Sequence, residues 1–515
     1  MAADHRQGNQ LRFPPDWNGS SLILDENDLQ MWPGVSTKLL TINGHFPGPT
    51  IRLRRGDTFE AEVRNLINNE EAVLHWHGLL SPAEYDGHPN QSISPGDSYN
   101  VAIPIFQEPS FCWYHAHTHD LTGSQVYRGL AGLFLIEDPE RDEALGLPTG
   151  DRDIPLVVRD WKSNAGFEMT YNPIMFEHMW GYLGDVAMVN GTPDAWFSVD
   201  QGVWRFRVLN GCNARVLRLG FSDGRAMRVI ASDGGLTGSM DTLNEIDLGP
   251  GQRVEILVSF EGIPIGASTK LQSLSFPVAA PGGGPVGPRQ GDPLDLLTFY
   301  IDNEGGSTLL PESLPAPDLV DPNQAVRTRT FDLGRFMGGH TINGTSYEMS
   351  RIDFQVFSDE VEIWEFVNQT LDYHPMHSHG AFFRILSRDG VSESAPIDKG
   401  WRDTVLVYPG ETVRVAISFG RRPGIFLVHC HNLEHEREMM QNFEVITSEA
   451  PLLSIRREED EIVVSWPAPS EGWSLEASND LTSWTMIDSG PVKADDEWVW
   501  RESILQPRFF RLVKV

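Results

Sequence analysis

The run Trp364-Glu365-Phe366-Val367-Asn368 is strand-like and ends in asparagine, and the turn Ile342-Asn343-Gly344 precedes it. The same pair of features occurs twice earlier, as Ile42-Asn43-Gly44 with Val63-Arg64-Asn65 and as Val189-Asn190-Gly191 with Phe206-Arg207-Val208-Leu209-Asn210. An Asn-Gly pair suits a turn that needs positive φ. Three such pairs in order, evenly spread, predict three similar β units.

The rest of the chain has the same β character. Short apolar or alternating runs are separated by Gly, Pro, Asn and Asp; examples are Thr50-Ile51-Arg52-Leu53, Leu130–Ile136, Arg205–Leu209 and Val361–Val367. Long helical periodicity is absent, and many short strands with frequent turn signals favour sandwiches or barrels. We expect a loop over Pro277–Pro293, before the strand Leu294–Ile301, and a joint near Pro315–Asn323.

Composition places the chain among soluble globular proteins. It has 515 residues, of which 40% are hydrophobic and 22% charged, and at about 100–200 residues per domain it predicts three or four domains. The net charge of −32 disfavours nucleic acid and anionic membranes as partners. No stretch approaches a membrane span, and the start, Met1–Arg6, lacks the apolar region of a secretion signal.

The three cysteines do not form a disulfide framework. With Cys430 as a metal ligand, only Cys112 and Cys212 could pair, and nothing in the sequence supports that pairing. We expect both to be small buried apolar residues.

The sharpest chemical signal is His429-Cys430-His431-Asn432-Leu433-Glu434-His435-Glu436-Arg437-Glu438-Met439-Met440. Two His, one thiolate and a weak axial Met are the ligands of a blue-copper site. Side chains alternate along a strand, so Cys430 faces one way while His429 and His431 face the other. One strand would therefore join two metal sites. A zinc site or core histidines are the alternatives, but zinc has no need of an axial thioether.

Three further clusters supply more imidazoles: His75-Trp76-His77, His115-Ala116-His117 and His374-Pro375-Met376-His377-Ser378-His379. A His-X-His pair on a strand puts both rings on one face. In the third cluster His377 and His379 form such a pair, while His374 sits apart and can serve the blue site. Four clusters, one with an embedded cysteine, indicate several metals held together.

In these four motifs and their order the chain resembles three-domain multicopper oxidases, the group of laccases, bilirubin oxidases and bacterial metallo-oxidases, over about residues 20–447. The resemblance implies an all-β fold of three consecutive cupredoxin domains, 1–150, 151–318 and 319–447, with the trinuclear cluster between the first and third. It also implies four coppers per chain. The implied type 1 ligands are His374, Cys430, His435 and an axial Met; the type 2 ligands are His75 and His377; the type 3 ligands are His77, His115, His117, His379, His429 and His431.

The axial ligand is the one departure from the family pattern. The family's spacing after the last histidine selects Met440, whereas the position of the next apolar strand residue, Phe443, selects Met439. Met440 is preferred, and Met439 remains the alternative. Reduction of dioxygen consumes protons, and Asp86 and Glu436 resemble the acids given that role in bacterial relatives; turn or surface carboxylates are the plainer interpretation. Of the remaining histidines, His119 is a candidate to line the water channel.

The predicted activity is one-electron oxidation of phenols or aromatic amines, coupled to reduction of O2 to water, with Cys430 as the electron conduit. The alternative is oxidation of Cu(I), Fe(II) or Mn(II); the 14 Met are spread out, which weakens a copper(I) role, while the acidity keeps metal ions open. A non-enzymatic copper carrier is a third possibility, which the extra histidines oppose. The resemblance implies an exported protein, periplasmic or extracellular, and we expect a monomer.

After about Thr447 the sequence pattern changes and histidine no longer occurs. The runs Glu461–Trp466, Trp473–Ala477, Trp484–Ile487 and Phe509–Val513 predict a small β domain over residues 448–515 without a reactive cluster. We expect an accessory or attachment module there, with a passive cap on the third unit as the alternative.

Overall fold

The computed structural model describes residues 6–32, 34–162, 169–279, 287–306, 310–336, 338–392, 395–447, 453–458, 461–467, 473–480, 483–487, 491–494, 497–503 and 508–514. The chain forms two compact units, Met1–Ile446 and Thr447–Val515. Strands dominate both, which confirms the all-β prediction. The first unit carries every candidate ligand named above.

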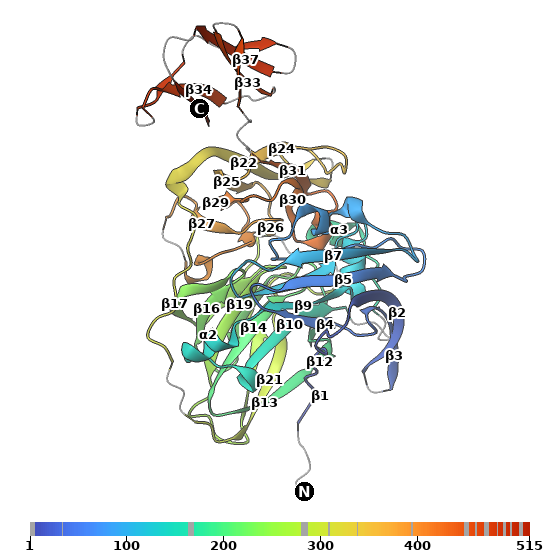
Figure 1. The fold of residues 1–515 in the computed structure, drawn as a ribbon. Helices are drawn as coiled ribbons and strands as arrows, with labels where there is room; N and C mark the ends of the chain where they lie inside the picture. The colour runs from blue at the N-terminus through green and yellow to red at the C-terminus, as the bar shows by residue number, and fades with distance from the viewer. Residues whose placement is uncertain are drawn as a thin grey trace. The chain divides into compact units, whose positions relative to one another are not determined.

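The first unit contains three pairs of sheets (Figure 1). The first pair is coloured blue to cyan in the figure. One of its sheets has the strand order β3 (Val35–Ile42), β2 (Ser21–Trp32), β5 (Thr58–Asn65), β7 (Ser98–Pro104). The other has the order β4 (Gly48–Leu53), β9 (Ala131–Ile136), β8 (Ser110–Ala116), β6 (Leu74–His75). Leu24, Ile42, Phe59, Tyr114 and Phe134 are among the buried residues that form one core cluster between these sheets. His75 and His115 face each other across β6 and β8.

The second pair is the largest. One sheet runs β12 (Thr192–Pro193), β11 (Val186–Val189), β10 (Asp153–Trp161), β14 (Val203–Asn210), β19 (Arg253–Ser259), β16 (Met227–Ser232), β17 (Gly235–Leu243). The other runs β1 (Asn9–Gln10), β13 (Ala195–Asp200), β21 (Leu294–Asn303), β20 (Ser268–Ser273), β15 (Leu217–Phe221), β18 (Ile246–Leu248). The start of the chain therefore adds an edge strand to the second pair of sheets, and Leu11 joins its core.

The third pair has the orders β23 (Gly339–Ile342), β22 (Ala325–Phe336), β25 (Val361–Asn368), β29 (Thr412–Ser418), β27 (Phe383–Arg388) and β24 (Phe354–Phe357), β31 (Met440–Ile446), β30 (Gly424–Cys430), β26 (His374–Ser378), β28 (Thr404–Val407). Its core includes Trp364, Phe366, Val428 and Cys430. Leu433, which follows β30, belongs instead to the core cluster of the first pair. The first and third pairs are therefore packed against each other beside the Cys430 motif.

The asparagines of the three Asn-Gly turns have the same conformation and make the same hydrogen bond. Asn43, Asn190 and Asn343 have φ of 53°, 49° and 55°, a left-handed conformation that asparagine tolerates better than most residues. In each case the side-chain oxygen accepts a backbone N–H, from Ile23, Val157 and Asp332 respectively, at 2.7–2.8 Å. The second asparagines, Asn65, Asn210 and Asn368, each end a strand and donate from Nδ2 to two or more backbone carbonyls. The sequence repeat thus marks three repeated structural units.

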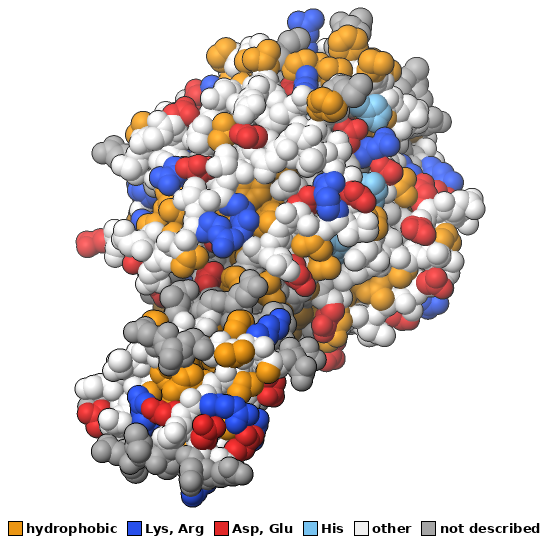
Figure 2. All heavy atoms as spheres, turned by 90° about the horizontal axis from the view of Figure 1, so that it is seen from above, with side chains coloured by type: hydrophobic (Ala, Val, Ile, Leu, Met, Phe, Trp, Pro, Cys, Tyr) orange, Lys and Arg blue, Asp and Glu red, His pale blue; other side chains and the backbone are white. Residues whose placement is uncertain are grey.

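The α-helices are short: α1 (Thr122–Arg128), α2 (Pro139–Ala144), α3 (Met175–Trp180) and α4 (Leu433–Glu436). None of these described helices has the length and apolarity needed to cross a membrane. Part of the predicted loop Pro277–Pro293, residues 280–286, lies outside the described residues, and its described flanks carry no strand. On the face drawn in Figure 2, acidic and basic side chains are interspersed and histidine shows only as small areas.

The C-terminal unit has two sheets, with the orders β32 (Ser454–Glu458), β33 (Glu461–Pro467), β37 (Glu497–Ser503), β36 (Val492–Ala494) and β35 (Thr485–Met486), β34 (Trp473–Ser478), β38 (Phe509–Lys514). Val464, Trp466, Leu475 and Trp500 form its own buried cluster. An independent core is what a separately folded module needs.

Candidate metal centres

One candidate centre lies around Cys430, at the end of β30. His374 Nδ1, on β26, lies 3.5 Å from the Cys430 Sγ, and His435 Nδ1, on α4, lies 3.9 Å from it. All three side chains are buried, with exposed fractions of 0–1%. Their ligand atoms converge closely enough to hold one ion.

Nε2 of each imidazole has a hydrogen-bond partner, which fixes the orientation of the ring. His374 Nε2 lies 2.8 Å from Thr370 Oγ1, and His435 Nε2 lies 3.1 Å from the Met179 carbonyl at the end of α3. Nδ1 of each ring is thereby left for a metal. Burial raises the pKa of the Cys430 thiol, so a stable thiolate there requires a bound cation.

Strand register decides which methionine shares the cysteine face. His429 is paired directly with Met440 across β30 and β31, and the Cys430 N–H donates to the Met439 carbonyl. Directly opposite side chains leave the same face of a sheet. Met440 therefore points with His429, away from the Cys430 face, and Met439 belongs to the same core cluster as Cys430. This geometry disfavours Met440, the residue preferred from spacing, because a single-residue step reverses the face.

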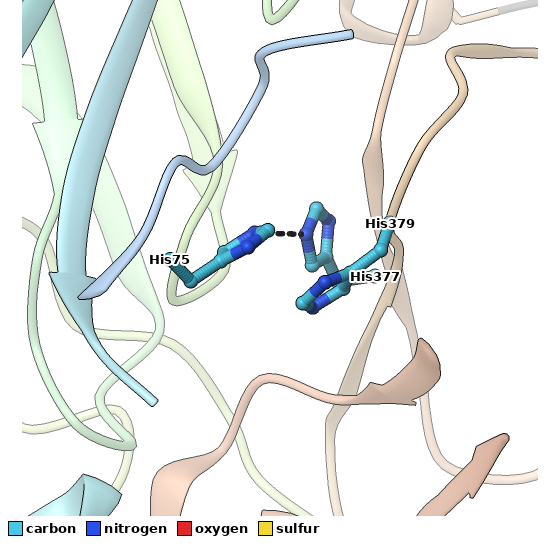
Figure 3. Close-up of side chains that lie close together, drawn as sticks. All are labelled: His75, His377 and His379. Atoms are coloured by element: carbon cyan, nitrogen blue, oxygen red, sulfur yellow. Dashed lines mark hydrogen bonds between the residues drawn. The ribbon is translucent and has the colours of Figure 1, made fainter. Parts of the chain in front are cut away.

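The second candidate centre is a cluster of eight buried histidines: His75, His77, His115, His117, His377, His379, His429 and His431. Figure 3 shows three of them, His75 from the first pair of sheets pointing toward His377 and His379 from the third. The Nε2 atoms of His75 and His377 are 3.4 Å apart, and those of His115 and His431 are also 3.4 Å apart. His429 Nε2 lies 3.1 Å from that of His379 and 3.3 Å from that of His117. Imidazole nitrogens bind metal at about 2.0–2.1 Å, so two on one ion lie roughly 3 Å apart.

Hydrogen bonds select the nitrogen that each ring presents. In five of the eight rings Nδ1 has a hydrogen-bond partner. Nδ1 of His75 contacts the Asp86 carbonyl, and Nδ1 of His379 contacts the Asp86 carboxylate. The other three contact backbone carbonyls: His377 that of Asp403, His115 that of Ala116, and His429 that of Cys430. His77 is the reverse case: its Nε2 lies 3.1 Å from Asp403 Oδ1, and its buried Nδ1 has no hydrogen-bond partner. A buried imidazole nitrogen without a hydrogen-bond partner is available to bind a metal.

Electrostatics favour the neutral, metal-binding form of the rings. Burial, reinforced by neighbouring histidines, holds the pKa of His75, His77 and His377 well below the ordinary value. Burial lowers the pKa of His429 to about 4 and that of His374 to about 3. Only unprotonated imidazole binds a metal, so the cluster is prepared for cations.

Two carboxyl groups predicted from sequence lie beside the histidine cluster. Asp86 Oδ2 is 2.6 Å from His379 Nδ1, Ser81 Oγ donates to Asp86 Oδ1, and burial raises the Asp86 pKa to about 7. Glu436 accepts from Thr122 Oγ1 and has Oε1 3.6 Å from His117 Nε2. Burial raises its pKa to about 8.

Sequence reasoning missed the residues that support these rings. Asp403 contacts His77 and His377, Arg253 pairs with Asp403, and the His340 ring stacks on His435 with centroids 3.7 Å apart. Arg253 and Asp403 carry no local motif; only the meeting of distant strands reveals them.

The remaining described histidines and cysteines lie outside the two candidate centres. His88 is buried and its Nε2 lies 2.8 Å from Asn442 Oδ1, whereas His45 and His178 are exposed. His119 is partly exposed, with its ring 5.2 Å from that of Tyr347, and His5 lies outside the described residues. Cys112 and Cys212 are free and buried, as expected.

Two stretches of the chain match family models described as multicopper oxidase, residues 25–141 and 313–449. The multicopper oxidase mco of Staphylococcus epidermidis is 30% identical over 448 residues, 84% of this chain and 91% of that protein. The cell division protein FtsP of Proteus mirabilis is 34% identical over 382 residues, 72% of this chain and 77% of that protein.

Solved structures give the same result. The laccase-like multicopper oxidase CueO of Ochrobactrum sp., described with oxidase activity towards lignin model compounds, superimposes with a TM-score of 0.75 at 33% identity, covering 85% of this chain and 100% of that chain. A Campylobacter jejuni multicopper oxidase, described as a metallo-oxidase, gives 0.74 at 26% identity, covering 86% of this chain and 96% of that chain.

The fold and the two centres define a copper-dependent oxidoreductase that uses oxygen as acceptor. The chain belongs to the multicopper oxidase family. Membership implies four coppers, one type 1, one type 2 and a type 3 pair, and the buried thiol with the orphaned His77 nitrogen fits that cofactor.

Proposed function

We propose that this protein oxidises phenols and aromatic amines by one electron at a time and couples four such steps to the reduction of O2 to water. In this proposal His374, Cys430 and His435 hold the type 1 copper, and His75 and His377 the type 2 copper. The type 3 pair is held by His77, His115, His117, His379, His429 and His431.

The observation that carries the proposal is the position of Cys430 between His429 and His431. The bound coppers supply one-electron chemistry at the type 1 site and dioxygen reduction at the cluster. The chain supplies the connection: the Cys430 thiolate is bonded through backbone to two imidazoles that face the other centre. It also excludes water, because all three side chains are buried.

We assign the axial type 1 position to Met439 rather than Met440. Its membership of the core cluster of Cys430 supports this assignment, as does the pairing of Met440 with His429. Met376 is directly opposite Cys430 on β26 and is the other thioether on this face.

Proton delivery falls to Asp86 and Glu436 in this proposal. Both are buried beside ligand histidines, and each carboxyl is linked to a hydroxyl, that of Ser81 or Thr122. A buried acid next to the reacting oxygen can supply the protons that water formation consumes.

The surroundings of the Cys430 centre support an aromatic donor. Helix α3, whose Met179 carbonyl contacts His435, begins with Met175 and Phe176, exposed at 77% and 51%. The nearby carboxylates are engaged: Asp372 pairs with Arg335, and Glu434 accepts from Tyr171, Tyr182 and Asn213. An apolar rim with paired acids suits a ring better than a divalent cation.

One observation favours the second candidate, a metal-ion oxidase. Met169, Met175 and Met179 are close together in the sequence, the last two on α3, and Met175 is 77% exposed. Soft thioethers prefer Cu(I). The C. jejuni structure described as a metallo-oxidase is of the same family.

A substrate panel tests the proposal. Copper-loaded wild type, Met175→Ala and Cys430→Ser are compared for oxygen uptake with a phenol, an aromatic amine, Fe(II), Mn(II) and Cu(I). We expect fastest turnover on the aromatic donors, unchanged by Met175→Ala, and neither blue colour nor turnover in Cys430→Ser. Preferential turnover of Cu(I), lost in Met175→Ala, would replace the first candidate with the second.

The proposal also covers location, assembly and domain bounds. We propose an exported monomer whose cupredoxin domains span 1–150, 151–318 and 319–447, with 448–515 as an accessory module. The CueO structure covers 85% of this chain with its whole length, and the second family-model match ends at residue 449.

A further inference from the structure

The second pair of sheets supplies none of the candidate ligands, yet one of its turns reaches the histidine cluster. Gly251, just before β19, has φ +82°, and a Cβ there would lie 3.0 Å from the ring of His431. Gln252 Nε2 donates to the Thr404 carbonyl at 3.0 Å. The next residue, Arg253, is completely buried.

The Arg253 guanidinium joins all three pairs of sheets. Its Nη1 and Nη2 each donate to an oxygen of Asp403 in the third pair, both at 2.6 Å. Its Nε donates to the Phe111 carbonyl of the first pair at 2.8 Å. This fork-to-fork geometry is the one in which arginine orients a carboxylate most strictly.

Asp403 in turn contacts two cluster rings that come from different pairs of sheets. Its Oδ1 lies 3.1 Å from Nε2 of His77, and its backbone carbonyl lies 2.8 Å from Nδ1 of His377. Thr404 Oγ1 is 2.8 Å from the same Oδ1 and 3.1 Å from His77 Nε2. Asp403 Oδ1 therefore accepts a hydrogen bond from the Nε2–H of His77, and in this tautomer Nδ1 of His77 is unprotonated.

We propose that Arg253 is a positioning residue for the trinuclear copper cluster: it fixes Asp403, and Asp403 sets the tautomer and angle of His77. The proposal rests on the ligand assignment above. Its consequence is that the domain without copper ligands controls copper retention at the cluster but not at Cys430, since Arg253 contacts no residue of the Cys430 centre. Outer partners of metal-binding histidines typically change affinity or activity by about 10–100-fold.

A purely structural role is the competing explanation, because a buried ion pair broken on one side destabilises any fold. Arg205 provides the matched control. It lies on β14 beside β19, is 2% exposed, and pairs with Glu255 and Asp142, neither of which contacts a candidate copper ligand. Arg205→Met and Arg253→Met thus remove the same group from the same sheet.

The experiment compares wild type, Arg253→Met, Arg253→Lys and Arg205→Met as full-length copper-loaded proteins. Copper per chain, the type 2 paramagnetic resonance signal and the blue type 1 absorption are measured before and after timed exposure to a chelator, and the melting temperature of each metal-free protein is recorded. The ligand assignment requires wild type to bind four coppers and to be blue; fewer than four, or no blue colour, defeats that assignment itself.

We expect Arg253→Met to keep the blue absorption and to lose cluster copper about 10–100-fold faster than wild type. Arg253→Lys, which keeps one charged contact, should be intermediate, and Arg205→Met should melt lower but retain all copper. Equal copper retention in Arg253→Met and wild type overturns the inference, as does equal loss in Arg205→Met and Arg253→Met. If Arg253→Met does not fold, Arg253→Lys decides alone: wild-type retention contradicts the inference, and selective loss at the cluster supports it.

Discussion

His429 and Met440 are paired directly across β30 and β31, so their side chains leave the same face of the sheet. Met439, one residue before β31, is in the same buried core cluster as Cys430. We therefore expect Met439→Leu to raise the reduction potential of the type 1 copper, because the axial thioether is lost. Met440→Leu and Met376→Leu serve as controls and should leave it unchanged. Redox titration of the blue absorption measures the effect, and a shift confined to Met440→Leu would return the assignment to that residue.

Asp86 is expected to deliver protons without contributing to the type 1 site. Asp86→Asn keeps a hydrogen-bonding group beside His379 but cannot release a proton, so oxygen uptake should fall by about 100-fold or more. The blue absorption should be intact. Ser81→Ala, which removes only the hydroxyl contact to Asp86, should show a smaller loss. A wild-type rate in Asp86→Asn removes this group from the mechanism.

Glu434 and Glu436 are buried acids on α4, on either side of His435, and they have different surroundings. Glu436 is close to His117, whereas Glu434 is held by Tyr171, Tyr182 and Asn213. We expect Glu436→Gln to slow oxygen reduction by about 100-fold while the blue site still accepts electrons. Stopped-flow reduction of the blue band under anaerobic conditions separates the two steps. Slowed reduction of that band, rather than slowed reoxidation, would contradict the assigned role.

We expect low pH to destabilise the ion pairs that join α2 to the second pair of sheets. Burial would raise the pKa of Asp142 and Asp153, but Arg205 and Arg207 outweigh it and hold both below the ordinary value. Because the folded pKa is lower than the unfolded value of about 3.9, the ionised form stabilises the fold above that pH. The stabilisation is lost as pH falls through the lower, folded pKa. Melting temperatures between pH 7 and pH 2 should show a smaller acid-induced drop in Asp142→Asn than in wild type; parallel curves would exclude this contribution.

The C-terminal unit is expected to be dispensable for copper chemistry. Thr447–Val515 has its own core, and every candidate ligand precedes it. Deletion of residues 448–515 should leave copper content and turnover per chain within about twofold, since the unit removed contributes no candidate ligand and has its own core. Loss of copper from the truncated protein would instead support a cap on the third domain.

Much of the fold was readable from local sequence. The three Asn-Gly turns correspond to three asparagines with positive φ, and the runs predicted as strands coincide with β4, β9, β14 and β25, except that Leu130 precedes β9. Of the predicted C-terminal runs, Trp484–Ile487 contains only the two-residue strand β35. The predicted first domain, residues 1–150, includes β1, and β1 pairs with β13, which lies in the predicted second domain. A strand of two residues has no pattern from which its partner could be predicted.

The sequence by itself determined the chemistry of the site: which residues can bind copper, and that Cys430 must face away from His429 and His431. Alternation along one strand is a local property that needs no partner. Only the tertiary structure shows that Met440 is paired with His429 and that Met439 is in the core cluster of Cys430, because a pairing register is set by two strands and reverses face with each residue. It alone also brought Arg253 to Asp403, since the long-range contacts of a buried ion pair leave no periodic trace in the chain.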